Sequence, residues 1–281
     1  MAIAIEQINA TDTIRGDIGF LRPTVRRPFT YNYEAGADAP AETVAFDVHS
    51  VEIRNVRRAP SALSLDTAGV ELLAHRSCVT DFDDDEAVTR VYYAEAEALI
   101  KGATGAREVV VFDHNIRRGL ALPLAGGRRN LGRPVMHAHT DYTPVSAVRR
   151  LSDHFGADAE RLARRRFLQV NLWRPIRGPL RDSPLAICDA SSIGANGLET
   201  VDLIYPSRRG EIYYLGYEPT QRWYYAPDMQ PDEAWLFKNF DSDAESPARF
   251  AAHSAFDERS APAPVRPRES IEVRAFAFLD G

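Results

Sequence analysis

The second half of the chain carries a series of short β-like segments, and this series constrains the fold more than any other feature. Eight such segments lie between residues 167 and 279, rich in β-branched and aromatic residues and separated by turn residues. Short strands at near-regular spacing are typical of closed or double-sheet β architectures such as the jelly roll. We therefore expect a mainly β fold with flanking helices. The segments are Phe167–Trp173, Leu185–Asp189, Val201–Tyr205, Glu211–Tyr217, Arg222–Tyr225, Ala234–Phe240, Arg249–Phe256 and Ser270–Leu279.

The first part of the chain, to about residue 113, is expected to be a mixed α/β elaboration. Alternating residues predict strands at Thr43–His49 and Val51–Val56. The acidic run at 83–86 precedes a helical pattern that extends to Ile100 and is closed by Gly102 and Gly105. The run Val109–Phe112 then predicts a buried strand.

A second helical pattern extends from Pro144 to Arg166 and is interrupted at Phe155–Gly156. The sequence contains no internal repeat and no low-complexity linker. We expect one domain over residues 1–281, with a core at about 114–281 that holds the candidate site described below.

Composition and charge favour a protein that acts on small molecules. Hydrophobic residues make up 44% of the 281 residues, the net charge is −6, and no basic stripe with interleaved aromatics suggests nucleic-acid binding. The N-terminus lacks a secretory signal pattern, and no window holds about 18 consecutive apolar residues, so we expect no membrane insertion. Cys78 and Cys188 are isolated and are expected to be reduced core thiols in a cytoplasmic protein.

A His-x-Asp pair, His139 and Asp141, is the main candidate for chemistry. Residues two apart on a strand share a face, so both side chains can reach the same ion. His253 follows 112 residues after Asp141, and a jelly roll brings a late strand back beside an early one. Two His and one carboxylate form the facial triad of non-haem iron oxygenases, which leaves positions for a chelating cosubstrate and O2.

His137 is the rival ligand, because His137 and His139 are also two apart. That pairing would be typical of a different centre, such as that of a zinc hydrolase. His253 alone is equally compatible with a core histidine. We prefer Asp141 as the partner and expect a supporting role for His137.

Arg268 and Ser270 supply a candidate anchor for the distal carboxylate of 2-oxoglutarate. A guanidinium holds a carboxylate through two parallel hydrogen bonds, and a hydroxyl on the same strand face can donate another. Arg259, Arg266 and Arg274 are competitors, but only Arg268 has a serine two residues on.

Several strings together resemble one family, that of the cephamycin 7-alpha-methoxylation component and the fungal gibberellin desaturase. The resemblance extends from about Ser64 to the C-terminus. The strings are Gly105–His114, His139–Thr143, Asn171–Pro175, Pro184–Asp189, Arg222–Pro227, Phe237–Ser242, His253–Phe256 and Pro267–Arg274.

The resemblance implies a double-stranded β-helix of the jelly-roll, cupin-like kind and an Fe(II)/2-oxoglutarate-dependent oxygenase with His139, Asp141 and His253 on the triad positions. We expect O2 and 2-oxoglutarate as cosubstrates and hydroxylation of a small molecule of specialised metabolism, with desaturation or oxidative cyclisation as other outcomes. A metal-dependent cupin-like hydrolase or isomerase and an inactive ligand-binding β-sandwich are the alternatives.

Three residues are expected to contact the substrate. Arg174 lies in a largely apolar strand, where a buried arginine needs either a protein carboxylate or an anionic ligand, and Asp189 and Asp202 are possible protein partners. Alternation does not decide whether Arg174 or Trp173 enters the pocket. Tyr142, next to Asp141, and Tyr205, in an aromatic-rich stretch, are the other two.

Overall fold

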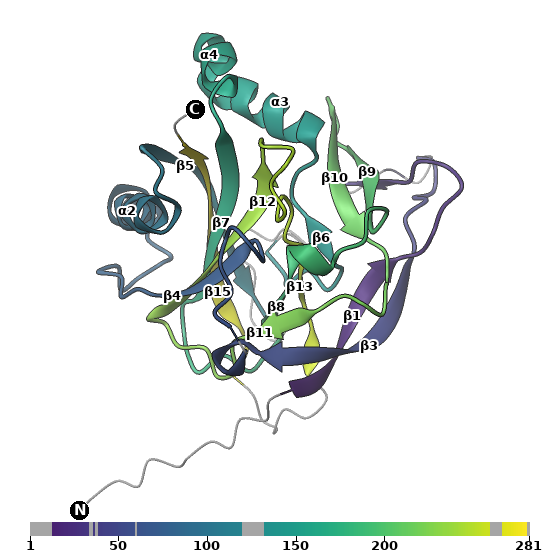
Figure 1. The fold of residues 1–281 in the computed structure, drawn as a ribbon, viewed down its shortest axis with the longest axis horizontal. Coiled ribbons are helices and arrows are strands. Elements are labelled where there is room, and N and C mark those ends of the chain that lie inside the picture. Colours follow the sequence, from purple (N-terminus) through teal and green to yellow (C-terminus); the bar gives the residue numbers. More distant parts are fainter. Residues whose placement is uncertain are drawn as a thin grey trace, which may run out of the picture.

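Two β-sheets packed against each other form the body of the protein, and helices flank the smaller sheet (Figure 1). The computed structural model describes residues 13–33, 36, 39–59, 61–119, 132–258 and 266–279. Among these residues, no helix is long and apolar enough to span a membrane.

The larger sheet has ten strands, and sequence-distant strands are neighbours within it. The strands β6 and β13 pair antiparallel, with His139 directly opposite His253. In spatial order they are β14 (Asp257–Glu258), β1 (Thr13–Leu21), β3 (Phe46–Asn55), β11 (Trp223–Tyr225), β8 (Leu185–Cys188), β13 (His253–Ala255), β6 (His139–Thr140), β10 (Arg209–Leu215), β9 (Leu198–Ile204) and β2 (Phe29–Tyr31).

The smaller sheet has five antiparallel strands, three of them long and almost wholly buried. In spatial order they are β4 (Val70–Ala74), β12 (Glu233–Asp241), β7 (Phe167–Pro175), β15 (Glu269–Phe278) and β5 (Glu108–Arg118). Alternation gives its central strands two faces. Leu172 and Val273 pack in the core that includes the helix residue Ile100, whereas Trp173 and Phe237 belong to a core that includes Ile187 of the larger sheet.

The helix α2 (Tyr93–Thr104) covers the outer face of the smaller sheet, as Figure 1 shows. The helical segment begins at the acidic run, as expected. The Asp84 side chain caps the short helix α1 (Asp85–Ala87) by accepting from the Ala87 N–H. A π-helical turn, η2 (Val88–Tyr92), joins α1 to α2, and Gly105 ends α2 in the left-handed conformation at φ 67°.

The second helical pattern also forms as expected. The helix α3 (Pro144–Phe155) begins with a capping box between Thr143 and Ser146 and ends at Gly156. The 3₁₀ turn η4 (Gly156–Asp158) and the short helix α4 (Ala159–Ala163) continue the chain to β7. Two further 3₁₀ turns are η1 (Val56–Arg58) and η5 (Ala190–Ser192).

The expected β architecture is confirmed, with local differences. The two segments predicted at 43–56 form the single strand β3, and the segment predicted at Arg249–Phe256 contains only the three-residue strand β13. Four strands, β1, β2, β4 and β14, were not predicted. The strand β5 crosses the expected boundary near residue 113, and β1 and β3 pair within the larger sheet. Cys188 is buried, but Cys78 is exposed, so the expectation of a core thiol there is wrong.

A buried ion pair at the end of β12 offers a test of the fold. Lys238 Nζ lies 3.1 Å from Asp241 Oδ2, both side chains are buried, and Arg166 donates to both oxygens of Asp241. Asp241→Ala should lower the free energy of unfolding by about 3–5 kcal/mol, because it leaves a buried ammonium without its partner. Lys238→Met should cost less, since Arg166 still neutralises Asp241.

Urea unfolding measures this difference. Glu160→Ala is the control, because it removes an ion pair with Arg164 in which both side chains are exposed. Equal losses of stability in Asp241→Ala and Glu160→Ala would contradict the prediction.

Candidate metal centre

Three side chains converge between the two sheets with ligand atoms suited to a metal ion. The candidate ligand atoms of His139, Asp141 and His253 all lie within 4.8 Å of one another. His139 Nε2 is 3.6 Å from Asp141 Oδ1, and the two imidazole rings have centroids 4.4 Å apart. The structure thus brings together the three residues that the sequence predicts as a triad.

Backbone carbonyls orient both imidazoles. His139 Nδ1 lies 2.8 Å from the carbonyl oxygen of His137, and His253 Nδ1 lies 3.5 Å from that of Ala251. With Nδ1–H donating to a carbonyl, Nε2 keeps its lone pair for an ion. The pKa of each histidine is lowered to about 4, mainly by burial and, for His139, also by the neighbouring His253. Both rings are therefore neutral near pH 7, as metal ligation requires.

The Asp141 carboxylate is held through one oxygen, so the other is directed toward the histidines. Asn171 Nδ2 donates to Oδ2 at 2.9 Å, and Arg274 Nε donates to the same oxygen at 3.0 Å. Burial alone would raise the pKa of Asp141, but Arg274 and the two histidines hold it well below its usual value. Asp141 is thus an anion whose Oδ1 is available to an ion.

Arg274 is itself neutralised on several sides. Its Nη1 lies 3.0 Å from Asp113 and its Nη2 lies 3.1 Å from Glu272, in addition to its bond to Asp141. These carboxylates raise its pKa against the opposing effect of burial. Arg274 therefore supports the metal ligand, and its guanidinium is already paired with carboxylates.

The local sequence explains why the strand β6 ends immediately before Asp141. The strand β6 ends at Thr140, and Asp141 and Tyr142 form a bend before α3. Thr143 is extended at φ −97° and ψ 169°, as the residue before a proline must be, and it caps the helix that begins at Pro144. Asp141 thus lies in a short connection between the end of a strand and the start of a capped helix.

Arg268 is a buried guanidinium that has no carboxylate within ion-pair distance among the described residues. It is 2% exposed, its Nε donates to Ser270 Oγ at 2.9 Å, and its Nη1 donates to the Ser183 carbonyl at 2.7 Å. Burial and the nearby Arg117 lower its pKa to about 9. Ser270 thus acts first as an acceptor that orients Arg268.

Two residues of β7, Asn171 and Trp173, show where the Arg268 side chain lies relative to the triad. Asn171, which holds Asp141, pairs with Phe237, whose ring is 4.6 Å from that of His253. Trp173, two residues further, stacks under the Arg268 guanidinium at 4.9 Å. Two residues on a strand span about 7 Å. The guanidinium therefore lies one pleat below the metal ligands, on the same face of the sheet.

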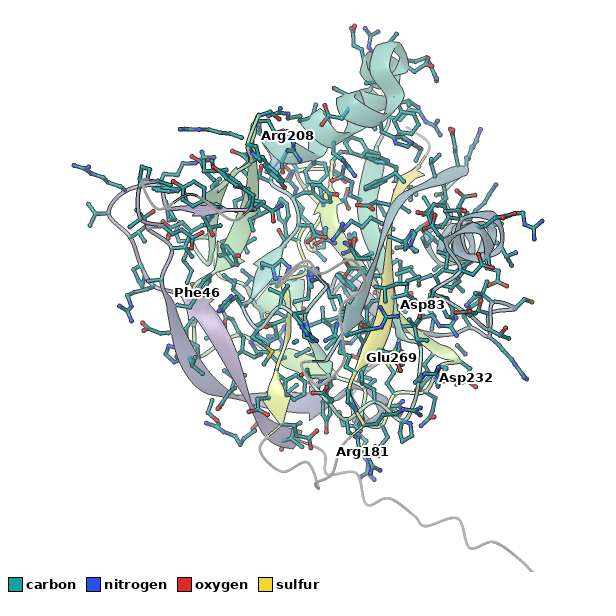
Figure 2. All side chains as sticks on the ribbon, turned by 180° about the vertical axis from the view of Figure 1, so that it is seen from behind. Phe46, Asp83, Arg181, Arg208, Asp232 and Glu269 are labelled. Atoms are coloured by element: carbon teal, nitrogen blue, oxygen red, sulfur yellow. The ribbon has the colours of Figure 1, made fainter. Side chains whose placement is uncertain are left out.

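The other candidates for metal ligand and for 2-oxoglutarate anchor have different surroundings. The His137 ring stacks on Phe46 at 3.7 Å, and only its carbonyl contacts the triad. Figure 2 labels Phe46 on β3. Arg266 is exposed, and Arg259 lies outside the described residues.

The structure does not bring Arg174 to the triad. Arg174 is opposite Ile271 in the register, on the face that α2 covers, whereas Trp173 faces the larger sheet. Its Nη1 lies 3.1 Å from His75 Nδ1, and its guanidinium lies 5.7 Å from the centroid of Tyr92. The partners expected for it are engaged elsewhere: Asp189 pairs with Arg222 and Asp202 with Arg27.

The two tyrosines lie in different places. Tyr142 follows Asp141, and its ring packs at the edge of the cluster beneath α3 that includes Phe276. Tyr205 lies at the tip of the β9–β10 hairpin, where Arg208 covers its ring at 3.7 Å. Figure 2 shows Arg208 at this tip, beside the helix.

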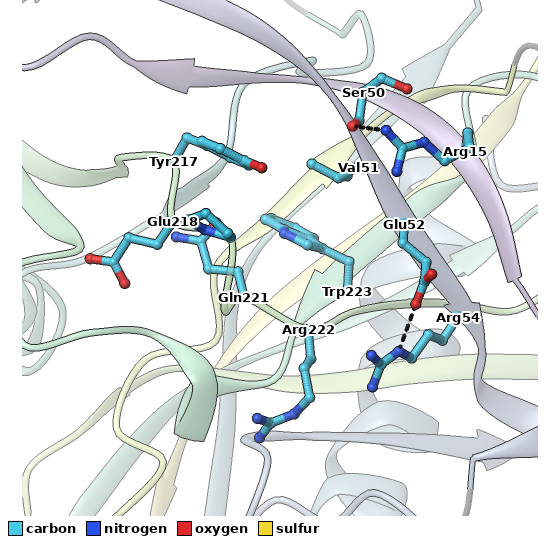
Figure 3. A pocket seen from close by; sticks show the side chains of 11 residues that line it. Arg15, Ser50, Val51, Glu52, Arg54, Tyr217, Glu218, Gln221, Arg222 and Trp223 are labelled. Carbon is cyan, nitrogen blue, oxygen red and sulfur yellow. Dashed lines mark hydrogen bonds and ion pairs between the residues drawn. The ribbon is translucent and has the colours of Figure 1, made fainter.

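A polar pocket of about 250 Å³ lies apart from these residues, between β3 and the chain leading into β11 (Figure 3). Arg15, Arg54 and Trp223 are among its lining residues, and none of the triad residues lines it. Arg15 donates to the Ser50 carbonyl and Arg54 to Glu52, so its arginines have protein partners.

Two supporting residues, Asn171 and Asn239, had no predicted role in the site, and Arg274 was considered only as a competing anchor for 2-oxoglutarate. Alternation along the last strand could have found Arg274, since residues 268, 270, 272 and 274 share a face. Asn171 shares a face with Trp173 for the same reason. Alternation also puts Asn239 on the face of Trp235 and Phe237, but its contact with Asp141 depends on how the two sheets pack.

Comparisons with known proteins agree with this geometry. A family described as an oxidoreductase/YMDC permease-like domain matches residues 18–278. The hydroxylase/desaturase efuI of Hormonema carpetanum is 32% identical over 255 residues, 84% of this chain and 85% of that protein. The Fe(II)/2-oxoglutarate-dependent dioxygenase nvfI of Aspergillus novofumigatus is 36% identical over 203 residues, 70% of this chain and 69% of that protein.

A solved structure of the iron and alpha-ketoglutarate-dependent endoperoxidase NvfI superposes with a TM-score of 0.87 at 27% identity. The match covers 97% of this chain and 100% of that one. The chain belongs to this family of iron(II)- and 2-oxoglutarate-dependent oxygenases. The expected family, jelly-roll fold, enzyme class and cofactors are thereby confirmed for this oxygenase, and the non-redox and inactive alternatives are not supported.

Removal of any one triad side chain should abolish iron retention. We expect His139→Ala, Asp141→Ala and His253→Ala each to lose Fe(II) binding under anaerobic titration, because a facial triad has no spare protein ligand. His137→Ala is the matched control and should keep it, since the His139 contact uses the His137 backbone carbonyl. Retained iron in Asp141→Ala, with loss in His137→Ala, would instead support a His-x-His centre.

Proposed function

We propose that this oxygenase binds iron through His139, Asp141 and His253, binds the distal carboxylate of 2-oxoglutarate through Arg268, and hydroxylates a small organic molecule. The observation that carries the proposal is the Arg268 guanidinium, which is buried beside the triad without a described carboxylate partner. A buried charge is costly unless an opposite charge neutralises it. An anionic cosubstrate supplies that charge.

The triad suits ferrous iron by the chemistry of its donors. Two neutral imidazoles and one carboxylate, without a thiolate, are the ligand set of non-haem iron oxygenases. When bound, iron together with O2 and 2-oxoglutarate supplies oxidising chemistry that releases succinate and CO2. The ligands leave adjacent coordination positions open for these cosubstrates.

The protein's own groups position the reactants. Ser270 Oγ fixes the Arg268 guanidinium from Nε, so its outer edge faces the cosubstrate. Trp173 supplies a rigid apolar wall beneath that guanidinium. The Asn171 and Arg274 contacts keep the Asp141 carboxylate from rotating. Among the three expected substrate contacts, Tyr142 is the one that we retain, because it lies next to Asp141 and near Arg274.

The outcome that we propose is hydroxylation, with desaturation or cyclisation as alternatives set by how the substrate C–H bond is placed. The relatives' names support this range, since efuI is a hydroxylase/desaturase and NvfI an endoperoxidase. We also propose a cytoplasmic location, which the free cysteines Cys78 and Cys188 support.

Succinate release tests the proposal directly. Purified protein with Fe(II), O2 and 2-oxoglutarate should form succinate only when the triad is intact. A true substrate should increase the rate of succinate formation and gain about 16 mass units, one oxygen atom, per hydroxylation. Iron binding without any 2-oxoglutarate consumption, across a panel of small molecules, would contradict an oxygenase role.

Loss of the Arg268 side chain should weaken cosubstrate binding selectively. Arg268→Leu is expected to raise the 2-oxoglutarate KM roughly 10- to 100-fold while iron stays bound, because a charge-assisted contact is worth about 1.5–3 kcal/mol. Steady-state succinate formation gives the KM.

Arg177→Leu is the matched control for this measurement. Arg177 is 55% exposed and pairs with Glu269, next to Arg268, so its loss should leave the KM unchanged. An unchanged KM in Arg268→Leu would move the anchor to another basic residue.

A further inference from the structure

We propose that Asn239 is a positioning residue that fixes the backbone of Asp141 and thereby aims its carboxylate at the metal. The proposal rests on the proposed metal triad. The Asn239 amide is buried and is not one of the three proposed metal ligands. It lies on the sheet opposite the strands that carry His139 and His253.

Asn239 is the extra residue of a β-bulge. Lys238 pairs with Val170 and Phe240 pairs with Gln169, which leaves Asn239 without a partner in the register. Asn239 follows the alternation of Trp235 and Phe237, whose side chains face the larger sheet, so its amide is on the side of the triad. The bulge lies at the level of the triad, because Phe237, two residues earlier, contacts the His253 ring.

The Asn239 amide accepts a hydrogen bond that the strand ladder does not provide. The strand β6 ends at Thr140, and the Asp141 N–H donates to Asn239 Oδ1 at 2.9 Å. Asn239 is fully buried, so water does not replace this acceptor. The backbone of the ligand-bearing residue is therefore held by one side chain.

A second amide, from the neighbouring strand β7, holds the other end of the same residue. Asn171 Nδ2 donates to Asp141 Oδ2, which leaves Oδ1 for the ion. Asn239 Nδ2 and Asn171 Oδ1 are buried atoms without a hydrogen-bond partner. Buried amides that leave an atom unpaired contribute less to stability than fully paired ones. Their placement around Asp141 thus points to orientation as their role.

Metal titration of the apo-protein separates positioning from simple stabilisation. Asn239→Leu removes the acceptor at similar volume, and Asn239→Ser shortens it so that it no longer reaches. Each should raise the Kd for Co(II), used as an oxygen-stable probe, by roughly 10- to 100-fold and change its visible absorption bands, as loss of an outer-shell contact does. The thermal midpoint of the apo-protein should fall no further than it does in the control below, which also leaves one backbone donor unpaired.

Ser242→Ala is the matched control. Ser242 Oγ accepts from the Phe167 N–H at 2.8 Å, just beyond the end of β12, so its loss also leaves a backbone donor unpaired but away from the triad. It should lower the apo midpoint and leave the Co(II) Kd within about twofold, because that contact is structural.

The outcomes distinguish failure of the Asn239 positioning role from failure of the metal centre itself. A Co(II) Kd within twofold of wild type in a folded Asn239 variant overturns the positioning role. If Asn239→Leu does not fold, Asn239→Ser decides the question, and loss of folding in both variants alone assigns Asn239 to stability and overturns it as well. Absence of Co(II) binding in the wild type, matching His139→Ala, would overturn the metal centre itself.

Discussion

The antiparallel pairing of β6 with β13 is the contact on which the site depends. It places His139 directly opposite His253, two residues that are far apart in the sequence. Directly opposite residues have neighbouring side chains. Both imidazoles consequently face the smaller sheet, and any shift of register by one residue would turn one of them to the opposite face.

The distribution of charge divides the arginines of the site into two kinds. Arg274 is surrounded by Asp141, Asp113 and Glu272, so its charge is already satisfied and it serves the metal ligand. Arg268 contacts a hydroxyl, a carbonyl and an aromatic face, and its depressed pKa reflects the cost of burying it. Of the two, Arg268 is the guanidinium whose nitrogens have no carboxylate at ion-pair distance among the described residues.

The sequence was informative where one strand carried the pattern and uninformative where two strands met. His139 and Asp141, two residues apart, and the Arg268–Ser270 pair were found from spacing alone. Arg174 as a substrate contact stays a prediction, and it lies on the face that α2 covers; alternation states that neighbours face apart but not which one faces the site. The position of helix α2 decides which face is which, because its apolar residues pack on the face that carries Ile271 and Val273. Sequence alternation does not show which sheet face a helix covers.

The strand lengths explain why the supporting residues lie where they do. The ligand-bearing strands are short, two residues for β6 and three for β13, so ladder hydrogen bonds alone hold them weakly. The facing strands β7, β12 and β15 have nine, nine and ten residues and pair along most of their length, with a bulge at Asn239. Side chains from these long strands, Asn171, Asn239 and Arg274, reach across to Asp141. The long strands thus fix the geometry of Asp141, which its own short strand could not fix alone.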